Sequence, residues 1–288
     1  AVHVDHDHLI HFDNPTEAPV LAKLSISSDN RYFPSREGNA ALDFIISELK
    51  SEGWLNGTVG LEYWSYIPNR VISEMMESAF HDAGCEVIDG SGVTREVRRI
   101  KSAKEIHYME EATRLADVGF DAIQNNLKPG ISELELFGEV TNAMMKAGSE
   151  FPALIPVFAS LPIVNDVLQI KGHSMAGHRI IREGEILVAD LCGVVNRYHG
   201  NVNRGFYVGD NPPKQIVDLY EKAGGAYAIV ENNTRAGMSV GEFSEIMIDF
   251  YKSINVWGKP GWSIGYELGI SLPPDWVGEF YFDVNDDP

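Results

Sequence analysis

The sequence predicts an α+β fold in two parts, a small α/β domain over residues 1–99 and a larger domain over residues 100–288. Two patterns support this prediction. Helical and strand patterns alternate in the first part, whereas beyond residue 100 a long helix leads to a second helix and then to a pair of strands. A chain of 288 residues with 44% hydrophobic content can bury a core in each part.

The first part alternates strands and helices. Residues 39–49 carry apolar side chains at helical spacing, and Pro68 is suited to the first turn of a second helix that reaches Phe80. Residues 57–63 and 85–88 are typical of short strands. This order predicts a small α/β domain that ends near Arg99.

The first eleven residues are rich in possible metal ligands: His3, His6, His8 and His11 alternate with Asp5 and Asp7. In an extended strand, alternation would place His6 and His8 on one face and His3 on the other. We therefore expect a polar strand or a frayed end here rather than a metal site.

The second part begins with a capped helix. Ser102 and Glu105 form a capping box, and the helix is expected over residues 103–127, before Pro129 and Gly130. The junction at residues 130–135 is echoed at residues 237–242, 107 positions later (237 − 130), and in both a glycine ends one helix while a serine caps the next. The echo predicts a duplicated unit of two helices and a hairpin.

Residues 173–209 carry the candidate chemistry. The run at Ile186 to Val188 favours a strand, residues 193–196 a turn, and residues 198–208 a returning strand. The hairpin and the segment before it would gather a carboxylate, two imidazoles, an amide and a guanidinium, from His173, Asp190, His199, Asn201 and Arg204. The alternative is an ordinary hairpin whose polar residues face water.

Composition limits the classes of molecule that this protein is expected to bind. The net charge of −19 disfavours nucleic acid and anionic membrane surfaces, because both require a basic face. Two cysteines, Cys85 and Cys192, are too few for a secreted disulfide framework, so we expect a reducing, cytoplasmic compartment. No apolar run reaches transmembrane length, and no signal peptide is visible, although the chain begins with Ala1 rather than Met.

Taken together, several ordered segments resemble the superfamily of creatinase, Xaa-Pro peptidases and methionine aminopeptidase, whose catalytic domain has the pita-bread fold. The segments are the junction at residues 99–106, residues 127–133, the run from His173 to Gly209, and the turn from Gly265 to Gly269. The resemblance implies a creatinase-type α/β domain followed by a pita-bread catalytic domain. It also implies that the chain lacks the start of the first domain and the end of the second.

The positions at which this sequence differs from the metal-dependent members indicate one branch of the superfamily. Those members have two aspartates eleven residues apart, where this chain has Asp190 and Asn201, and a ligand histidine, where it has Tyr266. A neutral amide and a phenol are poor ligands for hard dications. Residues 197–204 and 273–276 look most like ectoine hydrolase and its relatives, which form, with creatinase, a metal-free class.

The resemblance implies roles for individual residues. The general acid and base of that class maps onto His173, and Arg204 could clamp a substrate carboxylate. The remaining candidates, Asp190, His199, Asn201 and Tyr266, would bind or orient substrate groups. We expect a cofactor-free homodimer that hydrolyses a C–N bond in a small amino-acid-derived molecule. The alternatives are a metal-dependent Xaa-Pro peptidase and a non-catalytic binding module on the same fold.

Overall fold

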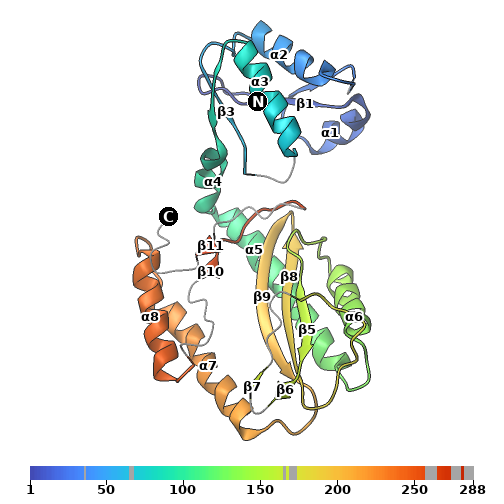
Figure 1. The fold of residues 1–288 in the computed structure, drawn as a ribbon, viewed down its shortest axis with the longest axis vertical. Helices are drawn as coiled ribbons and strands as arrows, with labels where there is room; N and C mark the ends of the chain where they lie inside the picture. The colour runs from blue at the N-terminus through green and yellow to red at the C-terminus, as the bar shows by residue number, and fades with distance from the viewer. Residues whose placement is uncertain are drawn as a thin grey trace. The chain divides into compact units, whose positions relative to one another are not determined.

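The computed structural model describes residues 1–35, 37–64, 68–164, 167–168, 174–256, 265–273 and 280–281. Contacts divide the chain into two compact units, Ala1–Val97 and Arg98–Pro288 (Figure 1). Within the described residues, no helix is both long enough and apolar enough to span a bilayer. The mixture of helices and strands in both units confirms the predicted α+β class.

The first unit contains two pairs of parallel strands, each connected through helix. Strand β1 (Ile10–Asp13) pairs with β2 (Asp29–Tyr32), and β3 (Thr58–Leu61) pairs with β4 (Glu86–Asp89). Parallel neighbours need a crossover, which the intervening helices provide. The helical elements are η1 (Pro15–Glu17), α1 (Ala18–Leu24), α2 (Ala40–Ser51), α3 (Arg70–Asp82) and α4 (Ser91–Arg99).

The helices and strands predicted between residues 39 and 89 are confirmed within a few residues at each end. The sequence patterns did not indicate β1, β2, α1 or α4. Helix α4 has nine residues and only two large apolar side chains, Val93 and Val97, which are too few to establish a helical pattern. Strands β1 and β2 have only four residues each, too few to establish an alternation.

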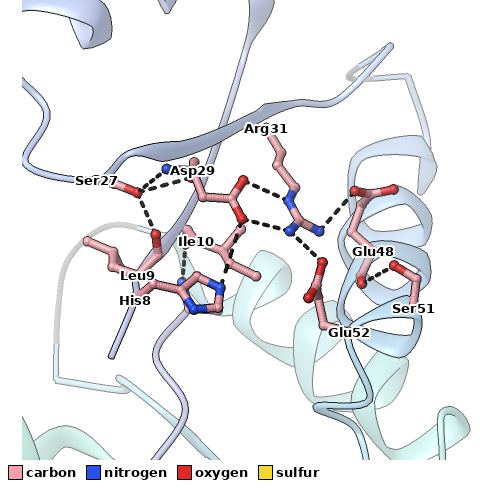
Figure 2. A network of polar contacts seen from close by, with 10 residues as sticks. His8, Leu9, Ile10, Ser27, Asp29, Arg31, Glu48, Ser51 and Glu52 are labelled. Atoms are coloured by element: carbon pink, nitrogen blue, oxygen red, sulfur yellow. Dashed lines mark hydrogen bonds and ion pairs between the residues drawn. The ribbon is translucent and has the colours of Figure 1, made fainter. Parts of the chain in front are cut away.

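A charged network ties β2 to α2 in the first unit (Figure 2). The Arg31 guanidinium donates to Asp29 at 2.9 and 2.7 Å, to Glu48 at 3.1 Å and to Glu52 at 2.6 Å. The hydrogen bond with Asp29 is the main cause that raises the pKa of Arg31, so the guanidinium stays charged. The hydrophobic core of this unit includes Ile10, Leu49 and Phe80.

Three histidines near the N-terminus pack against the indole ring of Trp54. The rings of His3, His6 and His8 have centroids 5.3, 5.4 and 5.1 Å from that of Trp54. The expected separation of His3 from His6 and His8 is therefore wrong, because a turn at residues 4–5 and a bridge from Val2 to Leu9 replace a continuous strand. No group of three or more His, Cys, Asp or Glu side chains in the described residues has the geometry of a metal site.

The second unit is built around a three-stranded antiparallel sheet in the order β5-β8-β9. Its strands are β5 (Val157–Leu161), β8 (Ile186–Val195) and β9 (Tyr198–Tyr207). Helix α5 (Ala103–Asn126) lies across one face of β8 and β9, beside α6 (Glu133–Lys146) (Figure 1). The other elements are α7 (Lys214–Asn233), α8 (Val240–Ser253) and the short strands β6 (Ile163–Val164), β7 (Val167–Leu168), β10 (Gly265–Tyr266) and β11 (Phe280–Tyr281).

The two predicted helix junctions have the expected geometry. Gly130 and Gly237 adopt φ angles of 95° and 81°, in the left-handed region that glycine tolerates. Ser132 and Ser239 then cap α6 and α8 by accepting hydrogen bonds from the backbone of Glu135 and Glu242.

The hairpin turn lies later than predicted. Strand β8 continues through Val195, which pairs with Tyr198, so only Asn196 and Arg197 remain as loop. Both adopt positive φ, 48° and 65°, as a two-residue turn that matches the twist of the strands requires. Gly193, the residue at which a turn was predicted, is instead a strand residue facing α5.

Candidate active site

The register of the hairpin decides which polar side chains share a face. Asp190 pairs with Asn203, Cys192 with Asn201, and Val194 with His199. Because paired residues in an antiparallel sheet point to the same side, these side chains lie on one face. The alternate residues face α5.

Three of the predicted site residues come together on that first face. The Asn201 amide nitrogen donates to Asp190 Oδ1 at 2.8 Å, and the Tyr266 hydroxyl donates to Asn201 Oδ1. Asp190 and Asn201 stand on adjacent strands, and Tyr266 comes from β10, 65 residues beyond Asn201. Because each of its two polar atoms has a partner of opposite character, the amide of Asn201 is fixed in orientation.

Two protonated, neutral groups lie near the Asp190 carboxylate. Burial and then the charge of Asp190 raise the pKa of the Tyr266 hydroxyl, so this phenol remains a hydrogen-bond donor at neutral pH. Burial, followed by the same carboxylate, also raises the pKa of the Cys192 thiol, to about 12. Cys192 was not identified from the sequence as a site residue, although its position two residues after Asp190 places it on the same face.

This donor set does not fit a pair of divalent metal ions. A two-metal centre needs several carboxylate or imidazole ligands, some of them bridging the ions. In the described residues Asp190 supplies one carboxylate, and its neighbours are an amide and a protonated phenol that bond to one another. These contacts use lone pairs that a metal would need.

His199 is directed into the protein interior, where its two ring nitrogens contact backbone groups, and its predicted role in substrate binding stays a prediction. Its side chain is fully buried, its Nε2 accepts from the backbone N–H of Ala153 at 3.0 Å, and its Nδ1 lies 2.8 Å from the carbonyl oxygen of Arg197. An Nε2 that accepts requires the proton to sit on Nδ1, which then donates to that carbonyl. Burial is the main cause that lowers the pKa of His199. Through these hydrogen bonds His199 links the loop around Ala153 to the end of the hairpin.

Arg204 lies on the opposite face from Asp190. It pairs with Ala189, on the side covered by α5, and its guanidinium carbon is 5.6 Å from the ring centre of Phe120 and 5.3 Å from that of Tyr227. The guanidinium is therefore not at the Asp190 face, and the predicted clamp on a substrate carboxylate stays a prediction. Cation–π contacts with two helices are the role that its position supports.

The remaining predicted residues cannot be placed. His173, Pro274, Asp275 and Trp276 lie outside the described residues. Pro273 is described and belongs to the lining of a cavity beside β8.

That cavity has a volume of about 470 Å³ and a mostly apolar wall. Cys192 belongs both to this wall and to the face that carries Asn201. The cavity is large enough to receive the hydrocarbon part of a small molecule. Side chains that contribute to it include Phe137, Met144, Met145, Phe151 and Met175.

Comparison with known proteins defines the class of this protein. Residues 107–281 match the model of metallopeptidase family M24, and the chain therefore belongs to that family. It has the pita-bread fold: a dipeptidase from Pyrococcus horikoshii superposes with a TM-score of 0.75 at 20% identity, covering 96% of this chain and 71% of the other. An Xaa-Pro dipeptidase from Bacillus anthracis superposes with a TM-score of 0.73 at 22% identity, over 90% and 68% of the two chains.

Two relatives show how varied the named activities in this family are. An ectoine hydrolase from Halomonas elongata is 27% identical over 244 residues, which cover 79% of this chain and 57% of the relative. An Xaa-Pro dipeptidase from Pyrococcus horikoshii is 26% identical over 218 residues, covering 76% and 60%. The chain thus spans less than two thirds of the length of either relative.

Proposed function

We propose that this protein hydrolyses a C–N bond in a small amino-acid-derived compound, such as a cyclic amidine or a guanidino acid, without a metal ion. Membership of the M24 family and the similarity to an ectoine hydrolase support the reaction class. The observation that carries the metal-free part is the hydrogen-bonded chain from Tyr266 through Asn201 to Asp190. In that chain a neutral amide donates to the Asp190 carboxylate, at the position where a metal-dependent site would have a second carboxylate.

In this proposal His173 moves the protons. Its imidazole takes a proton from water while the water oxygen forms a bond to the electrophilic carbon of the substrate. It then gives that proton to the nitrogen as the C–N bond breaks. An imidazole suits both steps because its usual pKa, about 6.5, lies near neutrality. Electrostatic stabilisation of the developing charge then has to come from fixed dipoles.

Asp190, Asn201 and Tyr266 would form the polar wall against which the substrate is held. The Asp190 carboxylate suits a cationic amidine or guanidine group. Asn201 and Tyr266 hold that carboxylate in place and add no charge of their own at neutral pH. His199 and Arg204 are not part of this polar wall, because His199 is fully buried and Arg204 lies on the opposite face of the sheet.

The main alternative is a metal-dependent Xaa-Pro dipeptidase, which the similarity to dipeptidases of that name favours. It would require bound metal, so loss of activity in a chelator separates the two. A non-catalytic binding module would show no turnover in either condition. We also propose a homodimer in a reducing, cytoplasmic compartment, in keeping with two buried free cysteines.

The decisive experiment is a substrate screen, with and without chelator, on the wild type and on His173→Ala. We expect chelator-resistant turnover that His173→Ala reduces by about two to four powers of ten without altering the circular dichroism spectrum. His178→Ala is the matched control, five residues away in the sequence, and should retain most of the activity. A folded His173→Ala variant with near-wild-type activity would contradict the assignment of His173 as the general acid and base.

A further inference from the structure

The cavity of about 470 Å³ beside β8 is the largest feature of the second unit that the proposed reaction leaves unexplained. Its wall is built by α6, by residues 149–156 between α6 and β5, by Met175, and by Leu191 and Cys192 of β8. Folded proteins contain few voids larger than a water molecule, because the atoms that line a void lose packing contacts. A cavity of this size is therefore a candidate for binding a ligand.

The cavity lies where β5 no longer covers the edge of β8. Strand β5 pairs with β8 from Ile186 to Asp190. Farther along β8 a loop takes its place: Val194 N–H donates to Ser149 Oγ at 3.1 Å, and Glu150 N–H donates to the Val194 carbonyl at 3.0 Å. The two residues of β8 that line the cavity come between these two sets of contacts in the strand.

The wall is suited to hydrocarbon. Three of the eight methionines in the chain, Met144, Met145 and Met175, contribute to it, and thioether side chains adapt to irregular apolar ligands. Glu150 also belongs to the wall, but its carboxylate is paired with the Arg197 guanidinium at 3.2 Å. Because this charge is engaged at the hairpin turn, the wall favours an apolar group over a cation.

The loop that forms much of the wall is held by the hairpin. Ala153 N–H donates to Nε2 of buried His199 at 3.0 Å. The Phe151 carbonyl accepts from Arg197 Nη1 at 2.7 Å. The cavity is thus formed before a ligand enters, and binding does not have to include the entropic cost of ordering this loop.

Cys192 connects the cavity to the Asp190 site. Its side chain is 2% exposed, belongs to the cavity wall, and shares a face of the sheet with Asp190 and Asn201. After burial, the main cause, the charge of Asp190 raises the pKa of the thiol and a hydrogen bond with Asn201 lowers it, so both groups are close to the sulfur. Residues two positions apart on a strand are separated by about 7 Å, a distance that one small molecule can span.

We propose that this cavity binds an alkyl group of the substrate while the amidine or guanidine group of the same molecule contacts Asp190. The inference rests on the role of Asp190 in the proposed function and narrows the substrate class: the amino-acid-derived compound carries an aliphatic substituent. The carboxylate attracts the cationic group, and the cavity selects for chain length by removing CH₂ groups from water.

The first test measures binding and needs no turnover. The Kd values of methyl-, butyl- and hexylguanidinium are determined by isothermal titration calorimetry. Each buried CH₂ group lowers Kd by about fourfold, so three buried groups of the five added would make hexylguanidinium bind about 60-fold more tightly than methylguanidinium. A Kd that does not depend on chain length, or no binding of hexylguanidinium, would overturn the inference.

Thr141→Trp and Asn142→Trp form a matched pair on α6. Thr141 belongs to the cavity wall, whereas Asn142 is exposed and is not among the described residues that line the cavity. An indole at position 141 fills part of the cavity, so the gain from methyl- to hexylguanidinium should fall below about fivefold while the Kd of methylguanidinium is unchanged. Asn142→Trp should keep the wild-type gain.

Equal gains in the two folded tryptophan variants would contradict the inference. If Thr141→Trp does not fold, Met145→Trp replaces it, because Met145 is a wall residue that is 44% exposed and tolerates a larger side chain more easily. The same loss of gain is expected from it.

NMR spectroscopy then locates the alkyl chain. In protein labelled with ¹³C-methyl methionine, hexylguanidinium should shift the signals of Met144, Met145 and Met175, each identified by its loss in a single methionine-to-leucine variant. The signals of Met75 and Met76, on α3 of the first unit, should be unchanged. Shifts that spare all three wall methionines would place the chain elsewhere and overturn the inference.

Asp190→Asn separates this inference from the proposed function. Loss of a charge-assisted contact should weaken all three ligands by about 10-fold or more and leave the gain with chain length as in the wild type. A folded Asp190→Asn variant that binds methylguanidinium as tightly as the wild type would contradict the role of Asp190 in the proposed function. Loss of the gain with chain length in the wild type would instead contradict the role of the cavity.

Discussion

Asn201 and Tyr266 set the chemistry of the Asp190 carboxylate. An aspartate at position 201 would add a second negative charge beside Asp190, and such a pair needs a cation to hold it together. The amide instead donates to Asp190 and accepts from the phenol, so position 201 adds no charge and both of its polar atoms are engaged. A single carboxylate among neutral donors suits a small organic cation better than a hard metal ion.

His199 gives a prediction for stability. Burial lowers the pKa of His199 in the folded chain below its usual value of about 6.5. Below about pH 6.5 the unfolded chain binds a proton that the folded chain excludes, and the free energy of unfolding therefore falls as the pH falls. His199→Gln cannot titrate. Its destabilisation, about 1–3 kcal/mol at pH 7.5, should therefore shrink at pH 5.5 in urea denaturation.

The comparison between variant and wild type isolates this residue, because the other histidines are present in both proteins. An equal destabilisation at the two pH values would contradict the assignment of His199 as a buried neutral group.

Strand alternation separates the site residues that could be predicted from those that could not. Asp190, Asn201 and Tyr266 were predicted together, and the structure brings them together. Arg204 has the opposite parity to Asn201 on the same strand, so alternation alone would have placed it on the other face. His199 has the parity of Asn201, and its burial depends on the loop at Ala153, which no local pattern in the strand reveals.

At the scale of elements, two glycines let α5 pack directly on the hairpin. A Cβ on Gly193 would lie 1.9 Å from the carbonyl oxygen of Ala112, and one on Gly200 would lie 2.3 Å from the backbone nitrogen of Thr113. Both obstacles are backbone atoms of one helix, so no side-chain rotation relieves them. We expect Gly193→Ala or Gly200→Ala to lower the free energy of unfolding by about 3 kcal/mol or more.

Gly224→Ala is the control for these substitutions. Gly224 lies within α7, and a Cβ there would meet no atom within 4 Å. Alanine should therefore stabilise that helix by about 0.5–1 kcal/mol. Chemical denaturation of the three variants measures all of these changes. If Gly193→Ala and Gly224→Ala had the same effect, the packing of α5 on the hairpin would be wrong.

Elements with strong local signals could be predicted, and elements that depend on distant contacts could not. Helix α5 has a capping box and an apolar stripe, and its predicted bounds differ from the observed ones by one residue. The hairpin turn was misplaced because Gly193 resembles a turn residue. Its actual role, to admit α5, depends on a helix some eighty residues earlier in the chain.

At the scale of the whole molecule, the question is how a chain of a metallopeptidase family could work without a metal. Family membership follows from the match over residues 107–281, and it does not fix the chemistry of the site. We predict that the purified protein holds no tightly bound divalent metal. The reason is a count of ligands within the described part of the chain: Asp190 is a carboxylate, whereas Asn201 and Tyr266 are neutral and bonded to one another.

Elemental analysis after dialysis tests this prediction. For Tyr266 to bind a metal well it would have to ionise, and burial and the charge of Asp190 oppose ionisation by raising its pKa further above the usual value of about 10. We expect far less than one equivalent of manganese, zinc, cobalt or iron, and no gain in thermal stability when any of them is added. Asn201→Asp is the matched variant, because it restores a second carboxylate and should increase metal binding. Near-stoichiometric metal in the wild type, removed by chelator with loss of activity and restored on re-addition, would overturn the metal-free proposal and favour the dipeptidase.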